Sequence, residues 1–487
     1  MNTRTFKLVT LAMISALYVG NVAAEELQQS DLTLATQQLE LENKVEEARL
    51  AAEKKAEEER LALEAEKRFS ERLGEVSLQF KPLIVKIYVE NHFSPIWTDN
   101  QAKQQFLHDY ALAIAGGISK RSANALNAIH EATGKGELIE DVLLTDAFLD
   151  YLFYATNVAK SAQKWLYAGN SYKAGQLSDE LVSAWLSAVK NNDNFTFVKN
   201  LSGENTLFKQ TSARVAHVIE AGVDKHNMVE LHRLAISAQR LRILPVFQEG
   251  IFVNIPSYEL NYYRDGQVVL SSRVIVGQSS RKTPVMSSRL SNVVVNPPWN
   301  APTRLINEDI IPKVRKDPSY IYRHGYTIID GSGNTIDPYT IDWENMSAKR
   351  FPYRLRQAPS DNSALGNYKF NMPSSEAIYL HDTPKRNLFG NKNRALSSGC
   401  VRVEKSDQLA TILLKEAGWT DERKQNVLKS KKTTSAGIKS DNPVFLYYVT
   451  AWVDKDQVHT LPDIYGYDKT PDLSYINWDI LKHYIQR

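Results

Sequence analysis

The segment 379–402, YLHDTPKRNLFGNKNRALSSGCVR, decides both the fold and the chemistry that we expect of this chain. It contains Cys400, which is the single cysteine in 487 residues. His381 precedes the cysteine and directly follows the apolar, strand-like run 377–380. A thiol that attacks an acyl group needs a base, donors for the oxyanion and a small neighbour that admits the substrate. His381 meets the first need and Gly399 meets the last.

An inert core residue is the alternative interpretation of Cys400, because unpaired cysteines are often buried. The flanking residues argue against it, since Ser397, Ser398 and Gly399 precede the cysteine and Arg402 follows it. Such a composition is typical of a turn and is poorly suited to a core strand. A histidine and a cysteine alone are a weak signal, because their spacing does not transfer between families.

The first 24 residues have the pattern of a Sec signal peptide. Arg4 and Lys7 are followed by the apolar run 8–20 and the small residues 22–24. An uncleaved inner-membrane anchor is the alternative, although the run is shorter than the roughly 20 residues of a membrane span. An unpaired thiol is a liability in an oxidising compartment, so its presence indicates that Cys400 is needed for its reactivity.

Composition changes along the mature chain predict an α+β fold class with four further parts. Residues 25–72 are rich in Ala, Glu, Lys and Arg and predict a charged helical spacer, with a short dimerising coiled coil as the alternative. Residues 73–245 show helical periodicity and predict a mostly α-helical scaffold domain. Residues 246–452 form short alternating runs and predict a β-rich domain, and 453–487 are expected to be a tail that packs on it.

Residues 299–363 interrupt the strand pattern of the β-rich domain. The insertion carries several tyrosines and tryptophans together with many charged residues. Insertions of this length usually have their own structure and often a function. A packing excursion without a function is the alternative.

Charge and motif content exclude several classes of function. A net charge of +3 without a basic, aromatic-rich motif indicates no nucleic-acid partner. No HExxH helix or Cys/His ligand pair is present, so we expect no metal and no cofactor. S-x-x-K at 279–282 and Ser-Asp-Asn at 360–362 are similar to motifs of penicillin-binding proteins. K-T-G is missing and the serine at 279 lies in a turn between strands, so we do not expect that mechanism.

The segment around the cysteine resembles the active-site segment of the L,D-transpeptidase (YkuD-domain) family, in which a histidine near a strand end precedes Ser-x-Gly-Cys-x-Arg. The matching residues are His381, Ser397, Gly399, Cys400 and Arg402. Most members carry a second histidine where this chain has Ser398. HDTP at 381–384 and LSSGCVR at 396–402 are similar to the large, lid-bearing periplasmic branch of Gram-negative bacteria.

The resemblance extends over about residues 245–468 and, more loosely, over the helical region. VGQSSRKTPV at 276–285 and ALGNYKFNM at 364–372 are similar to further segments of the family. The resemblance implies that the β-rich domain is the catalytic domain and that the insertion 299–363 is a lid over its groove. No convincing peptidoglycan-binding module is present in the helical region.

The resemblance implies a peptidoglycan L,D-transpeptidase of cell-wall biogenesis and cell shape, which is located in the periplasm and inactivated by carbapenems. His381 is expected to take the thiol proton, with the Asp382 carbonyl as its orienting partner. Cys400 then attacks the third residue of a tetrapeptide stem and releases D-alanine, while the Gly399 and Cys400 N–H groups form the oxyanion hole. A second stem accepts the acyl group in a 3-3 cross-link. Other cell-wall synthesis proteins are further implied partners.

Four more residues are candidates for contacts with the substrate. Tyr379 should share the face of His381, because strand side chains alternate, and Ser398 adjoins the nucleophile. Arg394 and Arg402 are candidate ligands of substrate carboxylates, and a structural salt bridge is the alternative for each.

Three other functions remain open at this point. Water can resolve the same acyl-enzyme, which would make the protein an L,D-carboxypeptidase. A protein amine can accept the acyl group, which would tether a lipoprotein to the wall. A scaffold that recruits wall enzymes is the third, and the reactive thiol argues against it. The acceptor site has no short motif, so the sequence does not separate transfer from hydrolysis.

Overall fold

The computed structural model describes residues 43–168, 172–347, 351–438 and 441–486. The predicted signal peptide and the first part of the predicted spacer lie outside these residues. The contacts divide the chain into two compact units, of which the first comprises 43–95 with 136–142 and the second the remainder. Among the described helices, none has the length and apolar character that a membrane crossing requires.

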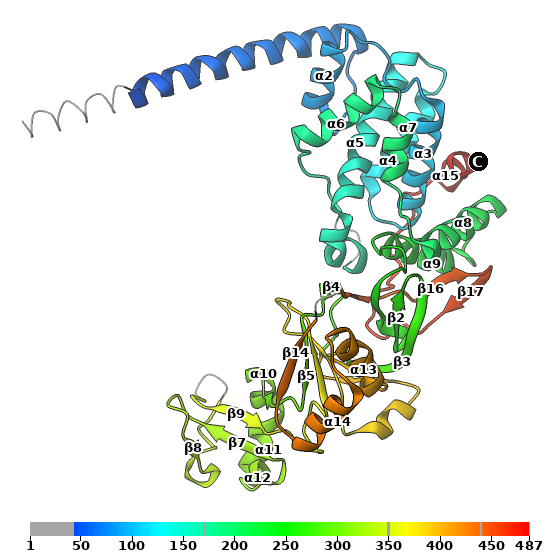
Figure 1. Ribbon diagram of the computed structural model, residues 1–487. Helices are drawn as coiled ribbons and strands as arrows, with labels where there is room; N and C mark the ends of the chain where they lie inside the picture. Colours follow the sequence, from blue (N-terminus) through cyan, green and yellow to red (C-terminus); the bar gives the residue numbers. More distant parts are fainter. Residues whose placement is uncertain (1–42, 169–171, 348–350, 439–440, 487) are drawn as a thin grey trace, which may run out of the picture. The chain divides into compact units, whose positions relative to one another are not determined.

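The first unit is built mainly on two helices (Figure 1). Residues 43–73 form one long helix, and α2 spans Lys81–Glu90. Charged side chains pair along the long helix at three- and four-residue spacing, as Arg60 does with Glu57 and Glu64, each at 2.6 Å. The side chains are exposed, so each pair contributes little to stability. The helix agrees with the predicted propensity, and its role as a spacer stays a prediction.

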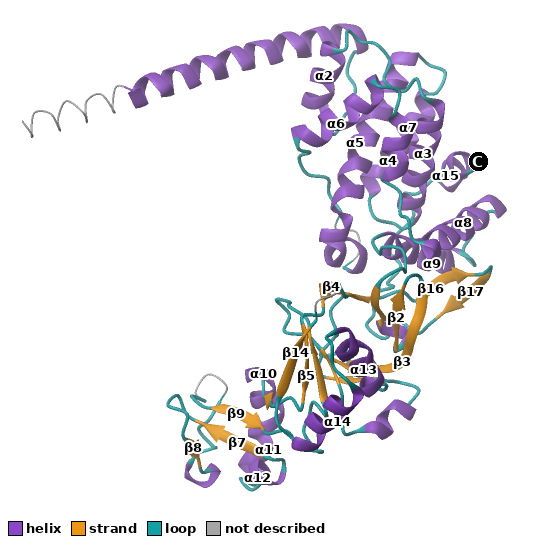
Figure 2. Ribbon diagram, in the orientation of Figure 1, coloured by secondary structure: helices purple, strands orange, loops and turns teal. Residues whose placement is uncertain are grey.

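Helices dominate the chain up to Arg242, as predicted, and strands follow (Figure 2). The helices are α3 (Asn100–Ala115), α4 (Lys120–Ala132), α5 (Glu137–Ala162), α6 (Asp179–Lys190), α7 (Asn194–Asn200), α8 (Thr206–Ala221) and α9 (Met228–Arg242). Side-chain caps fix several helix starts. The side chain of Asp99 accepts the N–H groups of Gln101 and Ala102 at the start of α3.

The β-rich part contains a sheet of eleven strands. They are β1 (Gly250–Asn254), β2 (Glu259–Arg264), β3 (Gln267–Gly277), β4 (Met286–Arg289), β5 (Asn292–Val295), β10 (Tyr368–Asn371), β11 (Leu380–His381), β12 (Ala395–Ser397), β13 (Val401–Val403), β14 (Thr434–Gly437) and β15 (Pro443–Tyr447). Their order is β14-β5-β10-β11-β13-β3-β2-β1-β15-β4, with β12 paired to β3. Asp265 and Gly266 both have positive φ and close the β2–β3 hairpin, as the Asp-Gly pair predicts.

The core of this part lies on one face of the central strands. Helices α13 (Ser406–Glu416) and α14 (Asp421–Ser430) follow β13, and α13 contacts β5 and β10. Leu380 and Val401 are fully buried in the same apolar cluster as residues of α13. Because side chains alternate along a strand, His381 and Arg402 point to the other face. The sheet therefore separates the core from the candidate catalytic groups.

The insertion forms a subdomain with its own core. Its elements are β6 (Trp299–Asn300), α10 (Thr303–Leu305), η3 (Ile306–Ile310), α11 (Ile311–Lys316), α12 (Tyr320–Arg323), β7 (Tyr326–Ile329), β8 (Thr335–Ile336), η4 (Pro338–Thr340) and β9 (Arg354–Gln357). The strands form a separate sheet, in the order β6-β9-β7-β8. Ile310, Val314, Ile328 and Leu355 are buried together. A segment with its own core fits the prediction of an independent element.

The end of the chain returns to the helices. Its elements are β16 (Ala451–Asp454), β17 (Gln457–Thr460) and α15 (Trp478–Ile485). β16 contacts α8 and α9, and α15 contacts α3, α4 and α8. The stretch around Tyr465 lies against the catalytic part, where the Tyr465 hydroxyl donates to the Gly277 carbonyl at 2.6 Å. The predicted tail on the β-rich domain is therefore wrong for α15, whose apolar side chains Ile480, Leu481 and Ile485 are buried on the helices.

Candidate active site

Three adjacent strands bring the candidate catalytic residues together. Lys369 of β10 pairs with His381 of β11, and His381 pairs with Arg402 of β13. Paired residues of neighbouring strands share a face of the sheet, so the three side chains form a row. Tyr379 directly precedes β11 and Cys400 directly precedes β13, which places both beside this row.

The turn that carries Cys400 is held by hydroxyl groups. Gly399 has a φ of 124°, a conformation that favours glycine. The Thr283 hydroxyl donates to the Gly399 carbonyl at 2.7 Å, and the Ser397 hydroxyl donates to the Cys400 carbonyl at 2.6 Å. Both carbonyls of the turn are thus fixed by side chains, and the nucleophile has a defined backbone position.

One predicted oxyanion donor is already engaged in this turn. The Gly399 N–H donates to the Ser397 hydroxyl at 3.1 Å, so we correct its predicted role. Serine side chains commonly bond the backbone two residues on, and the sequence analysis overlooked this property of Ser-x-Gly. The Cys400 N–H donates to no residue of the described chain and remains the candidate backbone donor.

His381 is a buried, neutral base with a defined tautomer. Its Nδ1 lies 2.5 Å from the Asp382 carbonyl oxygen, which confirms the expected orienting contact. A carbonyl only accepts hydrogen bonds, so Nδ1 carries the proton and Nε2 carries the lone pair. Burial lowers the pKa of His381 to about 3, with further contributions from the positive charges of Arg402 and Lys369. The imidazole is therefore neutral near neutral pH, and its Nε2 carries no proton.

A polar network fixes the Asp382 carbonyl in turn. Its carboxylate accepts hydrogen bonds from Arg386 and from the Ser406 hydroxyl, both at 2.7 Å, and from the Asn367 N–H at 2.9 Å. A Cβ on Gly366 would lie only 2.4 Å from this carboxylate, so a larger residue would displace it. The sequence analysis missed this support, for which the only local signal is the aspartate that follows His381.

The Cys400 thiol is half-buried and is bonded to Tyr379. Burial raises the pKa of Cys400. The N–H and hydroxyl of Tyr379 donate toward the sulfur and oppose that rise, as do the charges of Lys369 and Arg402. The Tyr379 ring also lies edge-on to the His381 ring, with 5.7 Å between centroids. The tyrosine therefore touches both the nucleophile and the base.

Arg394 is held by backbone carbonyls. Its guanidinium donates to the carbonyls of Asn391, Val274 and Tyr258 at 3.0–3.2 Å. These bonds tie the loop before β12 to β3 and to the turn before β2. Three of the five N–H donors of the guanidinium are used by backbone carbonyls, and the contact of Arg394 with a substrate carboxylate stays a prediction. The alternative of a salt bridge does not describe these partners.

Arg281, which the sequence analysis missed, connects the nucleophile turn to the insertion. Its Nη1 lies 3.0 Å from the Ser398 hydroxyl and 2.7 Å from an Asp309 carboxylate oxygen. Its Nη2 lies 2.7 Å from Glu308. Both acidic residues belong to η3 of the insertion. Ser398 is exposed, so its predicted contact with substrate stays a prediction.

Lys369 and Arg402, the two cations of the row, have no counter-ion among the described residues. Neither Lys369 nor Arg402 forms an ion pair or a side-chain hydrogen bond with any residue that the structure describes, and the Arg402 Nε is buried without a partner. Burial lowers the pKa of both side chains. The alternative of a structural salt bridge for Arg402 therefore does not fit, and two half-buried positive charges face the thiol and the imidazole.

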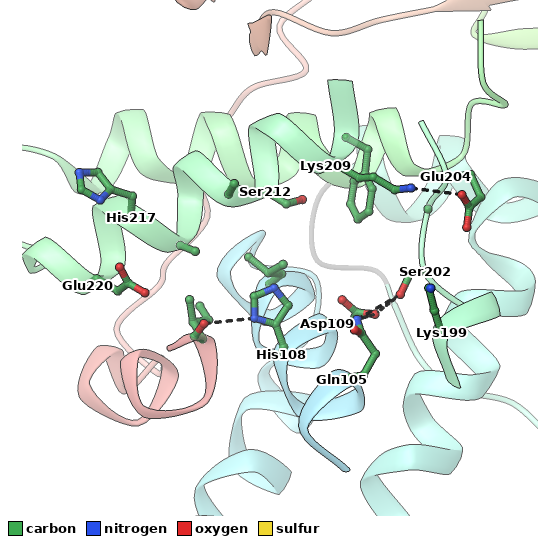
Figure 3. Close-up of a pocket in the computed structure, with 16 residues that line it drawn as sticks. Gln105, His108, Asp109, Lys199, Ser202, Glu204, Lys209, Ser212, His217 and Glu220 are labelled. Atoms are coloured by element: carbon green, nitrogen blue, oxygen red, sulfur yellow. Dashed lines mark hydrogen bonds and ion pairs between the residues drawn. The ribbon is translucent and has the colours of Figure 1, made fainter. Parts of the chain in front are cut away.

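A cavity of about 510 Å³ lies in the helical region between α3, α7, α8 and α15 (Figure 3). Its polar groups are largely paired with one another. Asp109 accepts from Gln105 at 3.0 Å, Lys209 lies 3.2 Å from Glu204, and His108 bonds a carbonyl of α15. It contains no cysteine. In the described part of the chain no group of three or more His, Cys, Asp or Glu is arranged to hold a metal ion. The site at Cys400 remains the candidate active site.

Comparisons with known proteins show which family the two regions of the chain resemble. Residues 248–418 match the family model of the L,D-transpeptidase catalytic domain, and residues 82–214 match that of a scaffold domain. A Haemophilus influenzae protein named "Putative L,D-transpeptidase" is 58% identical over 417 residues, which cover 86% of this chain and 84% of that protein.

Two solved structures show more distant likeness. One is the catalytic domain of an E. faecium L,D-transpeptidase acylated by ertapenem, at 11% identity, with 41% of this chain and 97% of that chain covered and a TM-score of 0.19. The other is an L,D-transpeptidase from Mycobacterium smegmatis, at 11% identity, with 42% and 60% covered and a TM-score of 0.20.

Proposed function

The chain belongs to the L,D-transpeptidase family, and on that premise we propose that it forms 3-3 cross-links between peptidoglycan stems through a thioester on Cys400. The observation that carries the proposal is the pairing of β11 with β13, which sets a neutral, oriented imidazole beside a half-buried thiol. Donor and acceptor are tetrapeptide stems. The reaction needs no cofactor, because the thiol and the imidazole carry out the covalent and proton-transfer steps.

The first half-reaction forms the acyl-enzyme. The Cys400 sulfur attacks the carbonyl carbon at the L-centre of the third stem residue while its proton moves to Nε2 of His381. The Cys400 N–H donates to the oxyanion of the tetrahedral intermediate. The bond to the terminal D-alanine then breaks, and its amine leaves with the proton from His381. The Asp382 carbonyl keeps the imidazole in the required tautomer throughout.

The second half-reaction transfers the acyl group. The side-chain amine of an acceptor stem attacks the thioester, gives its proton to His381, and the thiol of Cys400 is restored when the carbon–sulfur bond breaks. Exclusion of water favours transfer over hydrolysis. The insertion supports this role as a lid, because its first residue, Trp299, bonds to the hydroxyl of Tyr379 and its η3 pairs with Arg281.

Arg402 is the proposed ligand of a donor carboxylate. Its half-buried guanidinium lacks a partner among the described residues, and guanidinium groups match carboxylates in geometry. Tyr379 would form one wall of the donor groove beside the thiol, and Ser398 would lie at its exposed edge. Donor stems end in a free carboxylate, so a cationic site without an internal anion fits them.

We place the reaction in the periplasm. Residues 1–24 would direct secretion, and an uncleaved anchor is the alternative. The N-terminal helix and the helical scaffold would then serve contacts with the wall or with other cell-wall synthesis proteins. The boundaries proposed for the parts are 25–72, 73–245 and 246–452 with the lid at 299–363, while the end of the chain is assigned to the helices as described above.

The test is a product analysis by mass spectrometry. The mature chain is incubated with disaccharide-tetrapeptide, beside the Cys400→Ala variant. A dimer that has lost one D-alanine, and that is absent with the variant, is the expected product. If tripeptide is the only product, the acyl-enzyme is resolved by water and the protein is a carboxypeptidase. If the folded wild type leaves the substrate unchanged and forms no carbapenem adduct on Cys400, the enzymatic role is contradicted.

A further inference from the structure

The row Lys369–His381–Arg402 places a cation on each side of the imidazole. If His381 took the proton of Cys400 in the resting enzyme, three positive charges would share one face of the sheet. Charges at neighbouring positions repel strongly where water is excluded. A stable imidazolium is therefore disfavoured, and positive charge that stabilises a negative sulfur, beside the hydrogen bonds from Tyr379, must come from the flanking cations.

Charged and titratable groups reach the surroundings of the thiol from four elements. They are Lys369 on β10, Tyr379 and His381 at β11, Arg402 on β13, and Arg281 and Lys282 after β3. The charge of Arg281 is compensated by Asp309 and Glu308. Asp382 is compensated by Arg386 at 2.7 Å. The Lys282 ammonium donates to the Tyr465 carbonyl at 2.7 Å. Lys369 and Arg402, in contrast, have neither an acidic partner nor a carbonyl acceptor for their side chains among the described residues.

Lys369 is directed to the sulfur by Tyr379. Its ammonium lies 4.2 Å from the centroid of the tyrosine ring. The hydroxyl and N–H of the same tyrosine donate toward the Cys400 sulfur. The quadrupole of an aromatic ring holds an ammonium over its face. The charge of Lys369 therefore stays close to the Cys400 sulfur, to which the hydroxyl of the same ring donates. Both side chains are half-buried, so solvent screens this charge only in part.

We propose that Lys369 is a positioning residue that, from its place over the Tyr379 ring and together with Arg402, stabilises the thiolate of Cys400. The inference rests on the proposed function only in taking Cys400 as the nucleophile. The thiol ionises by losing its proton through Nε2 of His381, to solvent in the resting enzyme and to the leaving amine during acylation. No other reactant is required, because the lysine supplies charge and exchanges no proton.

The experiment measures the rate of alkylation of Cys400 by iodoacetamide as a function of pH. The sulfur displaces iodide and its proton goes to the buffer, so the rate follows the thiolate fraction. The chain has one cysteine, so the signal reports this thiol alone. Wild type is compared with Lys369→Met, with Lys369→Arg, which retains the charge, and with Lys392→Met, the same change at an exposed lysine of the same domain.

In Lys369→Met the midpoint of the pH profile should rise by about one unit, which slows alkylation about tenfold below the midpoint. Lys369→Arg should recover most of the rate, and Lys392→Met should match wild type. A folded Lys369→Met with the wild-type profile would overturn the proposal, and so would equal shifts in the Met and Arg variants. Alkylation needs no peptidoglycan, so these results are independent of whether cross-linking is observed.

Discussion

Buried cations in the helical region and at the catalytic site are surrounded in opposite ways. Arg240 of α9 is fully buried, donates to the Leu166 and Tyr467 carbonyls and lies 2.6 Å from Asp468. Its guanidinium also lies 4.6 Å from the centroid of the Tyr167 ring. A buried charge with such a set of partners is structural, because the partners replace the lost water.

Arg402 and Lys369 of the catalytic row lack such partners in the described chain. A half-buried charge without a partner lowers the stability of the folded state. Such charges are found mainly at sites where they bind a ligand or take part in a reaction. The two buried histidines differ in their neighbours. His232 of α9 and His381 are both buried, but of the two only His381 lies beside the candidate nucleophile Cys400. Partners, more than burial, therefore separate structural from functional charges in this protein.

The largest effect is expected from the two histidines. His381→Gln should lower the cross-linking rate by about 10²–10⁴-fold, because the proton acceptor is lost. His232→Gln should leave the rate per folded molecule unchanged. Initial rates are measured with both variants, with the folded fraction determined by circular dichroism. A comparable loss in His232→Gln would break the distinction between the two sites.

The two arginines should differ in their effect on unfolding. Arg240→Met should lower the free energy of unfolding by about 3–5 kcal/mol, because it leaves Asp468 buried with weaker compensation. Arg402→Met should leave that free energy unchanged or raise it, since it removes a charge without a counter-ion. Urea titrations of both variants test this. Equal destabilisation would show that Arg402 also has structural partners.

Acid should destabilise the protein through both histidines. Burial lowers the pKa of His232 to about 4 and that of His381 to about 3, against about 6.5 in the unfolded chain. The unfolded state therefore binds more protons below pH 6.5, and stability falls as the pH decreases. Each histidine should cost about 1.5 kcal/mol between pH 6.5 and 5. The loss should be smaller in His232→Gln, and an unchanged loss would exclude His232 as a source.

The smallest effect is expected at the contact between the insertion and the nucleophile turn. Arg281→Ala removes the bonds to Ser398, Asp309 and Glu308 and should raise the ratio of tripeptide to cross-linked product about fivefold, or by about 1 kcal/mol. The matched control is Arg304→Ala, which removes an exposed arginine that pairs with the same Glu308. A similar ratio of tripeptide to cross-linked product in the two variants would show that the bonds of Arg281 have no specific role in excluding water.

The local pattern around the cysteine was sufficient to predict the carbonyl that orients His381, and the same pattern carries the prediction of Cys400 as nucleophile and His381 as base. These contacts depend on residues adjacent in sequence, as His381 and Asp382 are. The pattern did not reveal Lys369 or Arg281, because strand register and a loop contact bring them to the site from elsewhere in the chain. The carbonyl partners of Arg394 were not predicted for the same reason, since they lie on other elements.

Helical and strand regions were separable because their apolar residues recur with different periods. The position of α15 could not be predicted from the sequence, because its apolar face can pack on any apolar surface. Which surface it covers depends on the arrangement of α3 and α8, which sequence periods do not specify. The engaged Gly399 N–H is a subtler case, in which a serine hydroxyl competes with the substrate for a backbone donor.

The return of the chain end to the helices has a consequence for the order of folding. The His108 side chain on α3 bonds the carbonyl of Ile485 on α15, a contact that spans 377 positions. Contacts of such separation close late, because the intervening chain must first be organised. The part of the second unit that is synthesised first is therefore completed last. A chain truncated before α15 would lack the apolar contacts that Ile480, Leu481 and Ile485 make with the helices.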